Sequence, residues 1–178
     1  APLFTHIASP AAQPPIGLVP GSENNPEKRW PVAHWRALIQ AFPAERFVLF
    51  GTANDIPITS AIAHGFAPAR VEDLAGKTTL LAYADRLRAC RLLVTNDTGG
   101  MHLANAPGVP LLVLFGPTNP LRTGPVFSAP ARTLQPPGCP ASGGGALADL
   151  SAASVMANLR PLLTASVCLP SSTLDLRH

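Results

Sequence analysis

Short apolar runs alternate along the chain with amphipathic stretches, and polar, glycine-bearing turns separate them. Continuous apolar runs of this length are typical of strands that are buried on both faces of a sheet. The predicted strands span residues 16–19, 46–50, 71–74, 92–94, 111–115 and 132–134. Because strands and helices alternate over short links, the pattern predicts one parallel α/β sheet of about six strands, with helices on both faces.

Apolar residues at helical spacing predict the helices between these strands. One helix follows Pro31, a second spans 56–64, and a third begins near Leu80. Ser151 is expected to cap a last helix, and Pro161 to end or kink it. The apolar stripes of these helices are assigned to the core, and they comprise Trp35, Leu38, Ile39 and Phe42, then Leu80, Tyr83, Ala84 and Leu87, and finally Val155, Leu159 and Leu162.

Length and composition favour one domain with a substantial core. The 178 residues divide into a Pro/Ala-rich arm or linker at 1–15, a predicted domain at 16–165 and a tail at 166–178 that is expected to be disordered. The linker character of the first segment suggests that the chain begins in mid-protein. A formal net charge of +3 is too weak and too scattered to indicate nucleic-acid binding.

Three cysteines, Cys90, Cys139 and Cys168, show no metal-binding spacing and cannot all pair, which favours a reduced, cytoplasmic compartment. No apolar run approaches the length of a membrane span, and the first residues lack the pattern of a signal peptide. The sequence also lacks a G-x-G-x-x-G after the first strand, a P-loop, an Asp-x-Asp pair and a G-x-S-x-G elbow. These absences count against NAD binding, P-loop chemistry, a metal-diphosphate site and hydrolase chemistry.

The stretch 92–119 organises the rest of the chain. Its first strand runs into the small polar turn Thr95–Gly100, and a helix of small residues follows. The unpaired N–H groups and the positive dipole at the start of such a helix favour an anion. Because His102 lies four residues after Thr98, the imidazole, the hydroxyl and the backbone N–H groups should meet at one place. Asp97 lies at the turn itself and would either cap the helix or hold a sugar hydroxyl.

Polar loops after the other strands should lie at the same edge, since ligands of open parallel sheets bind beyond the carboxyl ends of the strands. These loops bring Ser22 and Lys28, then Asn54 and Asp55, then Thr78 and Thr79, and finally Thr118 and Asn119. Each set also has a plainer interpretation. Lys28 would be solvated surface, the second and third sets would be helix caps, and the last would be a turn. Likewise, 96–102 would be a capped turn with a buried histidine. We interpret 96–102 as an anion site because its glycines, hydroxyl and imidazole converge.

Five motifs, in this order, resemble glycosyltransferase family 9, the lipopolysaccharide heptosyltransferases that use ADP-heptose. The resemblance spans about 16–124, with a weaker similarity in the last helix. It is carried by Pro20-Gly21-Ser22 with Lys28-Arg29-Trp30-Pro31, Phe50-Gly51-Thr52-Ala53-Asn54-Asp55, Leu74-Ala75-Gly76-Lys77-Thr78, Thr95-Asn96-Asp97-Thr98-Gly99-Gly100-Met101-His102, and Phe115-Gly116-Pro117-Thr118.

The resemblance implies a GT-B fold, in which two Rossmann-like domains face a cleft, and this chain is similar to the carboxyl-terminal, donor-binding half. It implies an inverting, metal-independent transfer from an ADP-sugar, without a cofactor, in lipopolysaccharide core synthesis. The acceptor would be a lipid-linked saccharide, so the implied location is the cytoplasm or the periphery of the inner membrane. The amino-terminal domain would supply the acceptor site and the general base, so no catalytic residue is expected here and the chain alone should be inactive.

The resemblance also implies roles for individual residues. Lys28 and Thr98 would stabilise the leaving diphosphate, and Asp97 would hold sugar hydroxyls. The adenosine would lie near Asn54 and Thr78. The full donor-binding set is Ser22, Lys28, Asn54, Thr78, Asp97, Thr98, Gly99, Gly100 and His102, with no metal ligand. The family usually carries an acidic residue near Asn54, and its Cys-containing segment after the fifth strand is reduced here to Cys139.

Two other functions fit the sequence. The Asp97-Thr98-Gly99-Gly100 turn is also similar to the Asp-Ser-Gly-Gly of UDP-N-acetylglucosamine 2-epimerases, which favour a glutamate where this chain has Met101 and His102. A non-catalytic nucleotide-binding or interaction module is the second alternative. The acceptor, the choice between heptose and another sugar, and the oligomeric state have no signature in the sequence.

Overall fold

The strands form one parallel sheet in the computed structural model, which describes residues 13–22, 25–105, 108–125 and 129–166. Within these residues six strands lie in the order β3-β2-β1-β4-β5-β6. They are β1 Ile16–Val19, β2 Phe47–Leu49, β3 Val71–Asp73, β4 Leu92–Asn96, β5 Leu111–Leu114 and β6 Ala131–Leu134. The α/β class and the parallel sheet that the sequence predicts are therefore confirmed.

The chain changes direction across the sheet at β1. Ile16 pairs with Phe47 of β2 on one side and with Leu92 of β4 on the other, and both ladders are parallel. The first three strands therefore spread to one side of the sheet and the last three to the other. In open α/β sheets the gap between the loops that leave this point is the usual place for a ligand.

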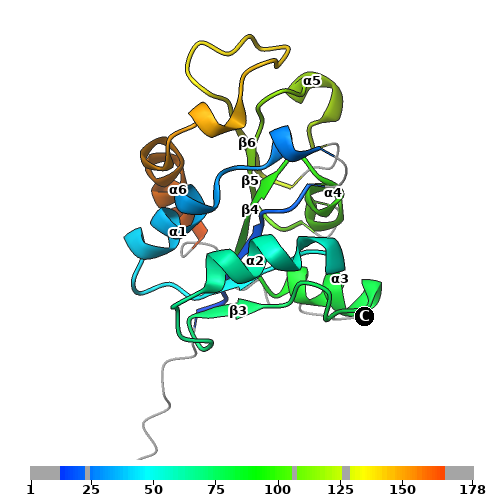
Figure 1. Cartoon of the computed structure of the whole chain (residues 1–178), viewed down its shortest axis with the longest axis vertical. Helices are drawn as coiled ribbons and strands as arrows, with labels where there is room; N and C mark the ends of the chain where they lie inside the picture. Colours follow the sequence, from blue (N-terminus) through cyan, green and yellow to red (C-terminus); the bar gives the residue numbers. More distant parts are fainter. Residues whose placement is uncertain (1–12, 23–24, 106–107, 126–128, 167–178) are drawn as a thin grey trace, which may run out of the picture.

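Helices cover both faces of the sheet (Figure 1). The helices α1 Val32–Ala41, α2 Ile56–Ala63 and α6 Ala152–Ser166 cover one face, and α3 Leu80–Arg88 and α4 Gly99–Asn105 cover the other. Four short helical segments lie in the loops, and they are η1 Pro26–Lys28, η2 Ala53–Asp55, α5 Pro120–Thr123 and η3 Leu147–Asp149.

Alternation along the strands produces two hydrophobic cores, because successive side chains of a strand point to opposite faces. In β5, Leu112 and Leu114 pack in the core beneath α1, α2 and α6. Leu111 and Val113 pack in the core beneath α3 and α4. All four side chains are almost completely buried. Because both faces of each strand are buried, the strand sequences are continuous apolar runs and do not alternate between apolar and polar residues.

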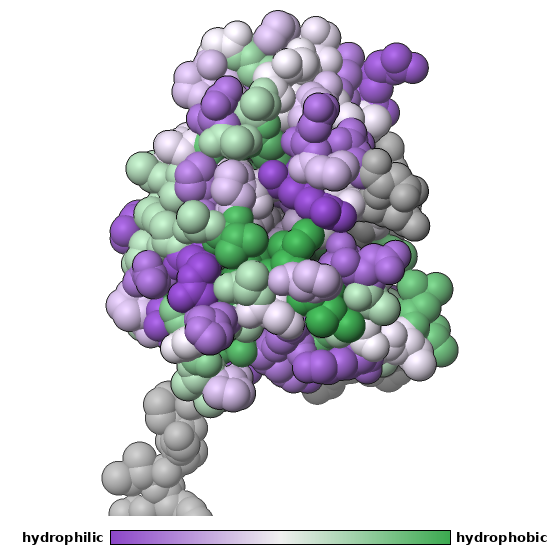
Figure 2. Space-filling model, viewed as in Figure 1, coloured by the Kyte–Doolittle hydropathy of each residue, from purple (hydrophilic) through white to green (hydrophobic). Residues whose placement is uncertain are grey.

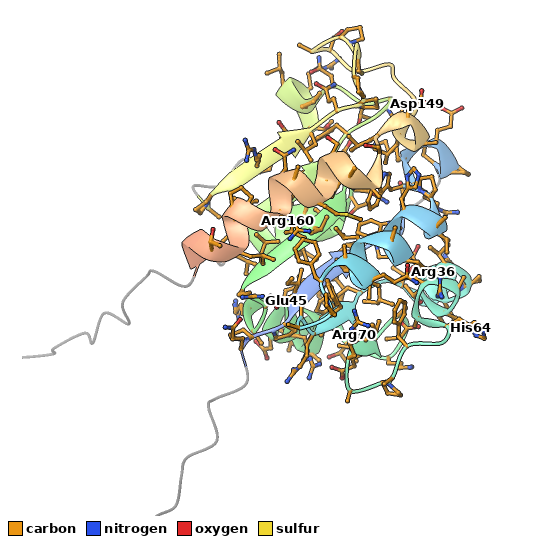
Figure 3. The ribbon with its side chains drawn as sticks, turned by 90° about the vertical axis from the view of Figure 1, so that its left-hand side faces the viewer. Arg36, Glu45, His64, Arg70, Asp149 and Arg160 are labelled. Carbon is orange, nitrogen blue, oxygen red and sulfur yellow. The ribbon has the colours of Figure 1, made fainter. Side chains whose placement is uncertain are left out.

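Polar contacts link the helices of the α1–α6 face (Figure 3). The Arg36 guanidinium of α1 donates to three carbonyl oxygens at the end of α2, with distances of 2.6 Å to His64, 2.8 Å to Ile62 and 3.2 Å to Ala61. These carbonyls lack partners within the helix, so a cation there acts as a cap. Arg160 of α6 lies 5.0 Å from the centroid of the Phe42 ring at the end of α1.

Apart from shifts of one residue at other element ends, the structure differs from the prediction in three places. Strand β4 continues two residues past the predicted end, through Asn96, so the turn begins at Asp97. Helix α6 does not end at Pro161 but runs on to Ser166, and its last buried side chain is Leu163 rather than Leu162. Leu80 is 69% exposed, so its assignment to the core is wrong. Most of the expected arm and tail lies outside the described residues.

Candidate functional site

A cavity of about 820 Å³ lies at the carboxyl edge of the sheet, beside the point where the strand order reverses. The loops after β1, β2, β3 and β4 all contribute to its lining, and α3, α4 and α5 contribute from the sides. Seven of the nine residues in the predicted donor-binding set line this cavity, namely Ser22, Lys28, Thr78, Asp97, Thr98, Gly99 and His102. Their convergence follows from the parallel sheet, because every strand delivers its following loop to the same edge.

An ion pair forms the polar end of the cavity. The Nζ of Lys28 lies 3.1 Å from Oδ2 of Asp97, and these side chains are 23% and 7% exposed. Thr123 donates to the same carboxylate oxygen over 3.2 Å. Lys28 comes from η1 after β1, Asp97 from the end of β4 and Thr123 from α5. Three loops that are distant in sequence therefore meet at one carboxylate.

Buried hydrogen bonds hold the β1 loop against the end of β4. Asn96 is fully buried, and its Nδ2 donates to the Pro20 carbonyl over 2.8 Å. Arg29 donates to the Ser22 carbonyl over 3.0 Å. Ser22 and Lys28 are therefore positioned by the neighbours that precede and follow them. Since an unmade bond to such a buried group is costly, this connection should keep the polar end of the cavity rigid.

The start of α4 lies beside the ion pair. Thr98, Gly99 and His102 line the cavity, and the N–H of Met101 donates to the Thr98 carbonyl over 3.1 Å. A Cβ at Gly99 would have no atom within 4 Å, so no neighbour excludes a side chain here. Glycine instead leaves the backbone open to close approach from the cavity. Gly100 follows in the same turn of α4.

Asp55 lies on the floor of the cavity, whereas Asn54 is exposed and is not among the lining residues. Asp55 Oδ2 accepts from the Thr52 N–H and hydroxyl over 2.8 Å and 2.9 Å, which closes a capping box. A Cβ at Gly21 would lie 2.2 Å from Asp55 Oδ1, so glycine makes room for this carboxylate. The Asp55 side chain makes no cap hydrogen bond to the helix that begins at Ile56, so the predicted cap of that helix is not formed. Asp55 instead completes the capping box of η2, and it also lines the cavity.

Leu80, Tyr83 and Leu103 form the apolar wall of the cavity. Hydrophobic side chains are visible over α3 at the lower right of the molecule in Figure 2. Tyr83 packs edge-on against Phe50, with ring centroids 5.3 Å apart. Burial raises the pKa of Tyr83 to about 12, and the nearby negative charge of Asp55 adds to this effect. The phenol is neutral at physiological pH, as an ordinary tyrosine is, and can act as a donor.

The sequence indicated no cavity-facing role for Leu80, Tyr83, Leu103 or Thr123, and it left Asp55 as an alternative to Asn54. The helical stripe that contains Leu80 and Tyr83 looked like an ordinary core face. Nothing marked Thr123, because it lies in a four-residue helix with no periodicity. Within the described residues, no group of three His, Cys, Asp or Glu side chains is placed to hold a metal ion.

The strand order and the cavity at its switch point define a Rossmann-like domain. The family model for glycosyltransferase family 9 (heptosyltransferase) matches residues 3–134. The chain therefore belongs to glycosyltransferase family 9.

Individual relatives agree with this assignment. Lipooligosaccharide heptosyltransferase 2 of Haemophilus influenzae is 40% identical over 119 residues, which cover 64% of this chain and 34% of that protein. The solved structure of Escherichia coli ADP-heptose lipopolysaccharide heptosyltransferase II matches with a TM-score of 0.78 and 32% identity, covering 90% of this chain and 49% of that one. E. coli heptosyltransferase WaaC, solved with ADP, matches with a TM-score of 0.71 and 26% identity, covering 86% and 46%.

The chain spans about a third of the length of the first curated relatives and about half of the first solved chains. Among the described residues, no helix is both long and apolar enough to cross a membrane.

Proposed function

We propose that this chain binds the ADP-sugar donor, ADP-heptose, of a lipopolysaccharide heptosyltransferase. One observation carries the proposal. The cavity at the switch point of the sheet joins a cation, small backbone turns and an apolar wall in one continuous lining. A nucleotide diphosphate sugar needs these three features for its phosphates, its sugar and its base. Family membership favours this function over that of a 2-epimerase.

Lys28, Thr98 and the backbone at Gly99 would take the diphosphate. An ammonium and a hydroxyl can both donate to phosphate oxygens, and bonds to charged acceptors are the stronger kind. His102 lies on the same side of α4 and lines the same cavity, so it would complete this group of donors. The Asp97 carboxylate accepts hydrogen bonds, so it would hold sugar hydroxyls rather than phosphates.

The adenosine would lie along the apolar wall of the cavity. Leu80 and Tyr83 offer an apolar surface of the kind that buries a flat base, and Thr78 lies at the same end of the cavity. Asp55 is the acidic residue of the η2 loop that lines the cavity, so it would accept from the ribose hydroxyls. Asn54, which is exposed, would then contribute only from the rim.

The reaction that follows is an inverting displacement without a metal ion. An acceptor hydroxyl attacks the anomeric carbon, the bond to the diphosphate breaks, and ADP leaves with the bonding electrons. A base outside this chain takes the hydroxyl proton. Lys28 and Thr98 stabilise the charge that grows on the leaving diphosphate, and losing one such donor can cost about 3 kcal/mol.

Because the acceptor site and the base belong to the family's other domain, this chain alone should transfer nothing. The acceptor would be a lipid-linked saccharide, which implies a cytoplasmic site beside the membrane.

Calorimetric titration of the chain with ADP, ADP-heptose and UDP-N-acetylglucosamine tests the proposal. The two ADP compounds should bind and the UDP-sugar should not. His102→Ala should lower the affinity for ADP by about tenfold, since it removes one donor to a charged group. His64→Ala, at the exposed end of α2, is the matched control and should change nothing. Binding of the UDP-sugar alone would favour the epimerase, and binding of none of the three would contradict the proposal.

A further inference from the structure

The hydroxyl of Thr123 lies between two acceptors at the end of α5. Its Oγ1 is 3.2 Å from Asp97 Oδ2 and 3.1 Å from the carbonyl oxygen of Asn119. A hydroxyl has one hydrogen, so it can donate fully to only one of them at a time. The bond to Asn119 is the ordinary local bond of a helical threonine. The bond to Asp97 is different, because it joins residues that are 26 positions apart.

The carboxylate oxygen that Thr123 reaches also accepts from Lys28, over 3.1 Å. Asp97 is only 7% exposed, so water replaces a lost donor poorly. In the proposed function, the diphosphate attracts the Lys28 ammonium and takes a share of its charge. The carboxylate then depends on its second donor, and Thr123 is placed to be that donor.

The backbone around Thr123 is well supported. Asn119 caps α5 by accepting from the N–H of Leu121 over 2.9 Å. The loop at 136–145 packs behind this segment, and the Gly144 N–H donates to the Gly116 carbonyl over 3.1 Å. A Cβ at Gly143 would lie 2.2 Å from the Thr118 carbonyl oxygen, so the packing is close. The Thr123 hydroxyl is therefore presented to Asp97 from a fixed position.

We propose that Thr123 is a positioning residue that holds the Asp97 carboxylate toward the donor sugar while Lys28 binds the diphosphate. The inference rests on the proposed function, because it takes Asp97 as the group that contacts sugar hydroxyls. Its consequence is selective. Thr123 contributes to the binding of an ADP-sugar and hardly at all to the binding of ADP alone.

Titration of the chain and its Thr123→Val variant with ADP and with ADP-heptose tests this inference. The variant keeps the shape of the side chain and removes the hydroxyl. It should bind ADP-heptose about tenfold more weakly and ADP within about twofold of the unmodified chain. Thr123→Ser should restore most of the lost affinity. Thr133→Val, on the exposed part of β6, is the matched control and should leave both ligands unaffected.

A double-mutant cycle with Asp97→Asn shows whether Thr123 acts through this carboxylate. In that background Thr123→Val should cost little further affinity, whereas fully additive losses would contradict the inference. Equal losses for ADP and ADP-heptose, or no loss for either, would also overturn it. Unmodified chain that binds ADP-heptose no better than ADP would refute this inference but leave the nucleotide site standing. Absence of binding for both ligands would refute the proposed function as well. Should Thr123→Val fail to fold, Thr123→Ala removes the same hydroxyl.

Discussion

Strand β4 carries an ion pair at each end, and the two pairs are nearly equally buried. At its amino end, Arg91 pairs with Glu45, and their side chains are 9% and 21% exposed. At its carboxyl end, Asp97 pairs with Lys28, and the values are 7% and 23%. Burial alone therefore does not distinguish them. Their surroundings do, because only the second pair lines the cavity.

The amino-terminal pair sits among further contacts within the protein. Arg91 donates to the Gln13 side chain over 2.8 Å and, through its backbone, to the Pro15 carbonyl over 3.1 Å. The carboxyl-terminal pair instead faces open volume, and an ammonium can donate three bonds. The first arrangement is suited to fastening β4 to its neighbours. The second is suited to sharing its charge with a ligand, and four predictions test this contrast.

The largest effect concerns the dry interior beside Arg91. Burial raises the pKa of Cys90 from 9.0 to about 12. Below pH 9 the thiol is protonated in both the folded and the unfolded chain. Between pH 9 and 12 only the unfolded chain loses the proton, so the free energy of unfolding falls as pH rises. The loss is at most about 4 kcal/mol, at about 1.4 kcal/mol per tenfold change in proton affinity.

Urea unfolding between pH 8 and pH 11 measures most of this loss, about 3 kcal/mol over the two pH units above 9. Cys90→Ala should reduce the fall in stability over that range, whereas Cys139→Ala, which changes a partly exposed thiol, should not. Parallel curves for the unmodified chain and Cys90→Ala would contradict the raised pKa of the buried Cys90 thiol.

Removal of Arg91 should affect folding and not binding. Arg91→Ala leaves Glu45 without its charged partner and should lower the free energy of unfolding by about 3 kcal/mol. The affinity for ADP, measured at a temperature where the variant is folded, should stay within about twofold. A clear loss of ADP affinity without a loss of stability would reverse the roles that we assign to the two pairs.

Removal of Lys28 should instead affect the binding of ADP more than the stability of the fold. Lys28→Met deletes a charged donor to phosphate. It should lower the affinity for ADP by about thirtyfold, or about 2 kcal/mol. Stability should fall by only about 1 kcal/mol, because Asp97 keeps Thr123 as a donor. Lys77→Met, which removes an exposed ammonium bonded to the Asp73 carbonyl, is the control for loss of charge. Equal ADP affinities for both variants would contradict a diphosphate contact by Lys28.

The smallest effect separates two adjacent leucines at the start of α3. Leu80 and Leu81 are 69% and 79% exposed, but only Leu80 lines the cavity. Leu80→Ser should lower the affinity for ADP by about threefold, as expected for partial loss of apolar contact. Leu81→Ser should leave this affinity unchanged. Neither change should alter thermal unfolding, because both side chains face solvent. If both variants weaken ADP equally, the apolar wall is not the adenosine surface.

The comparison also explains what could be predicted from the sequence. The sheet and its edge follow from alternation, since apolar strands and polar turns each leave a local signal. Residues in the long polar turns, such as Ser22, Lys28 and Thr98, could therefore be placed at the cavity. Asn54 and Asp55 are adjacent in the same short turn, and which of them faces the cavity depends on the orientation of η2.

The remaining differences come from tertiary structure. Leu80 has the spacing of a core residue, but the first turn of α3 projects past the sheet to the rim of the cavity. Pro161 lacks an N–H and should weaken α6. The helix continues because Leu159 and Leu163, on either side of this proline, are both buried against the core. Thr123 acts across 26 residues, and no local pattern reveals such a contact.

Hydrogen–deuterium exchange of the chain with and without ADP-heptose tests the central claim most directly, because it compares both edges of the sheet in one experiment. Backbone amides at 19–22, 76–83 and 97–103 should exchange more slowly with the ligand. Amides around Glu45 and at 88–92, at the amino edge, should be unchanged. Protection confined to the carboxyl edge is the predicted result. Protection centred on the amino edge, or none at 97–103 under saturating ADP-heptose, would contradict the account.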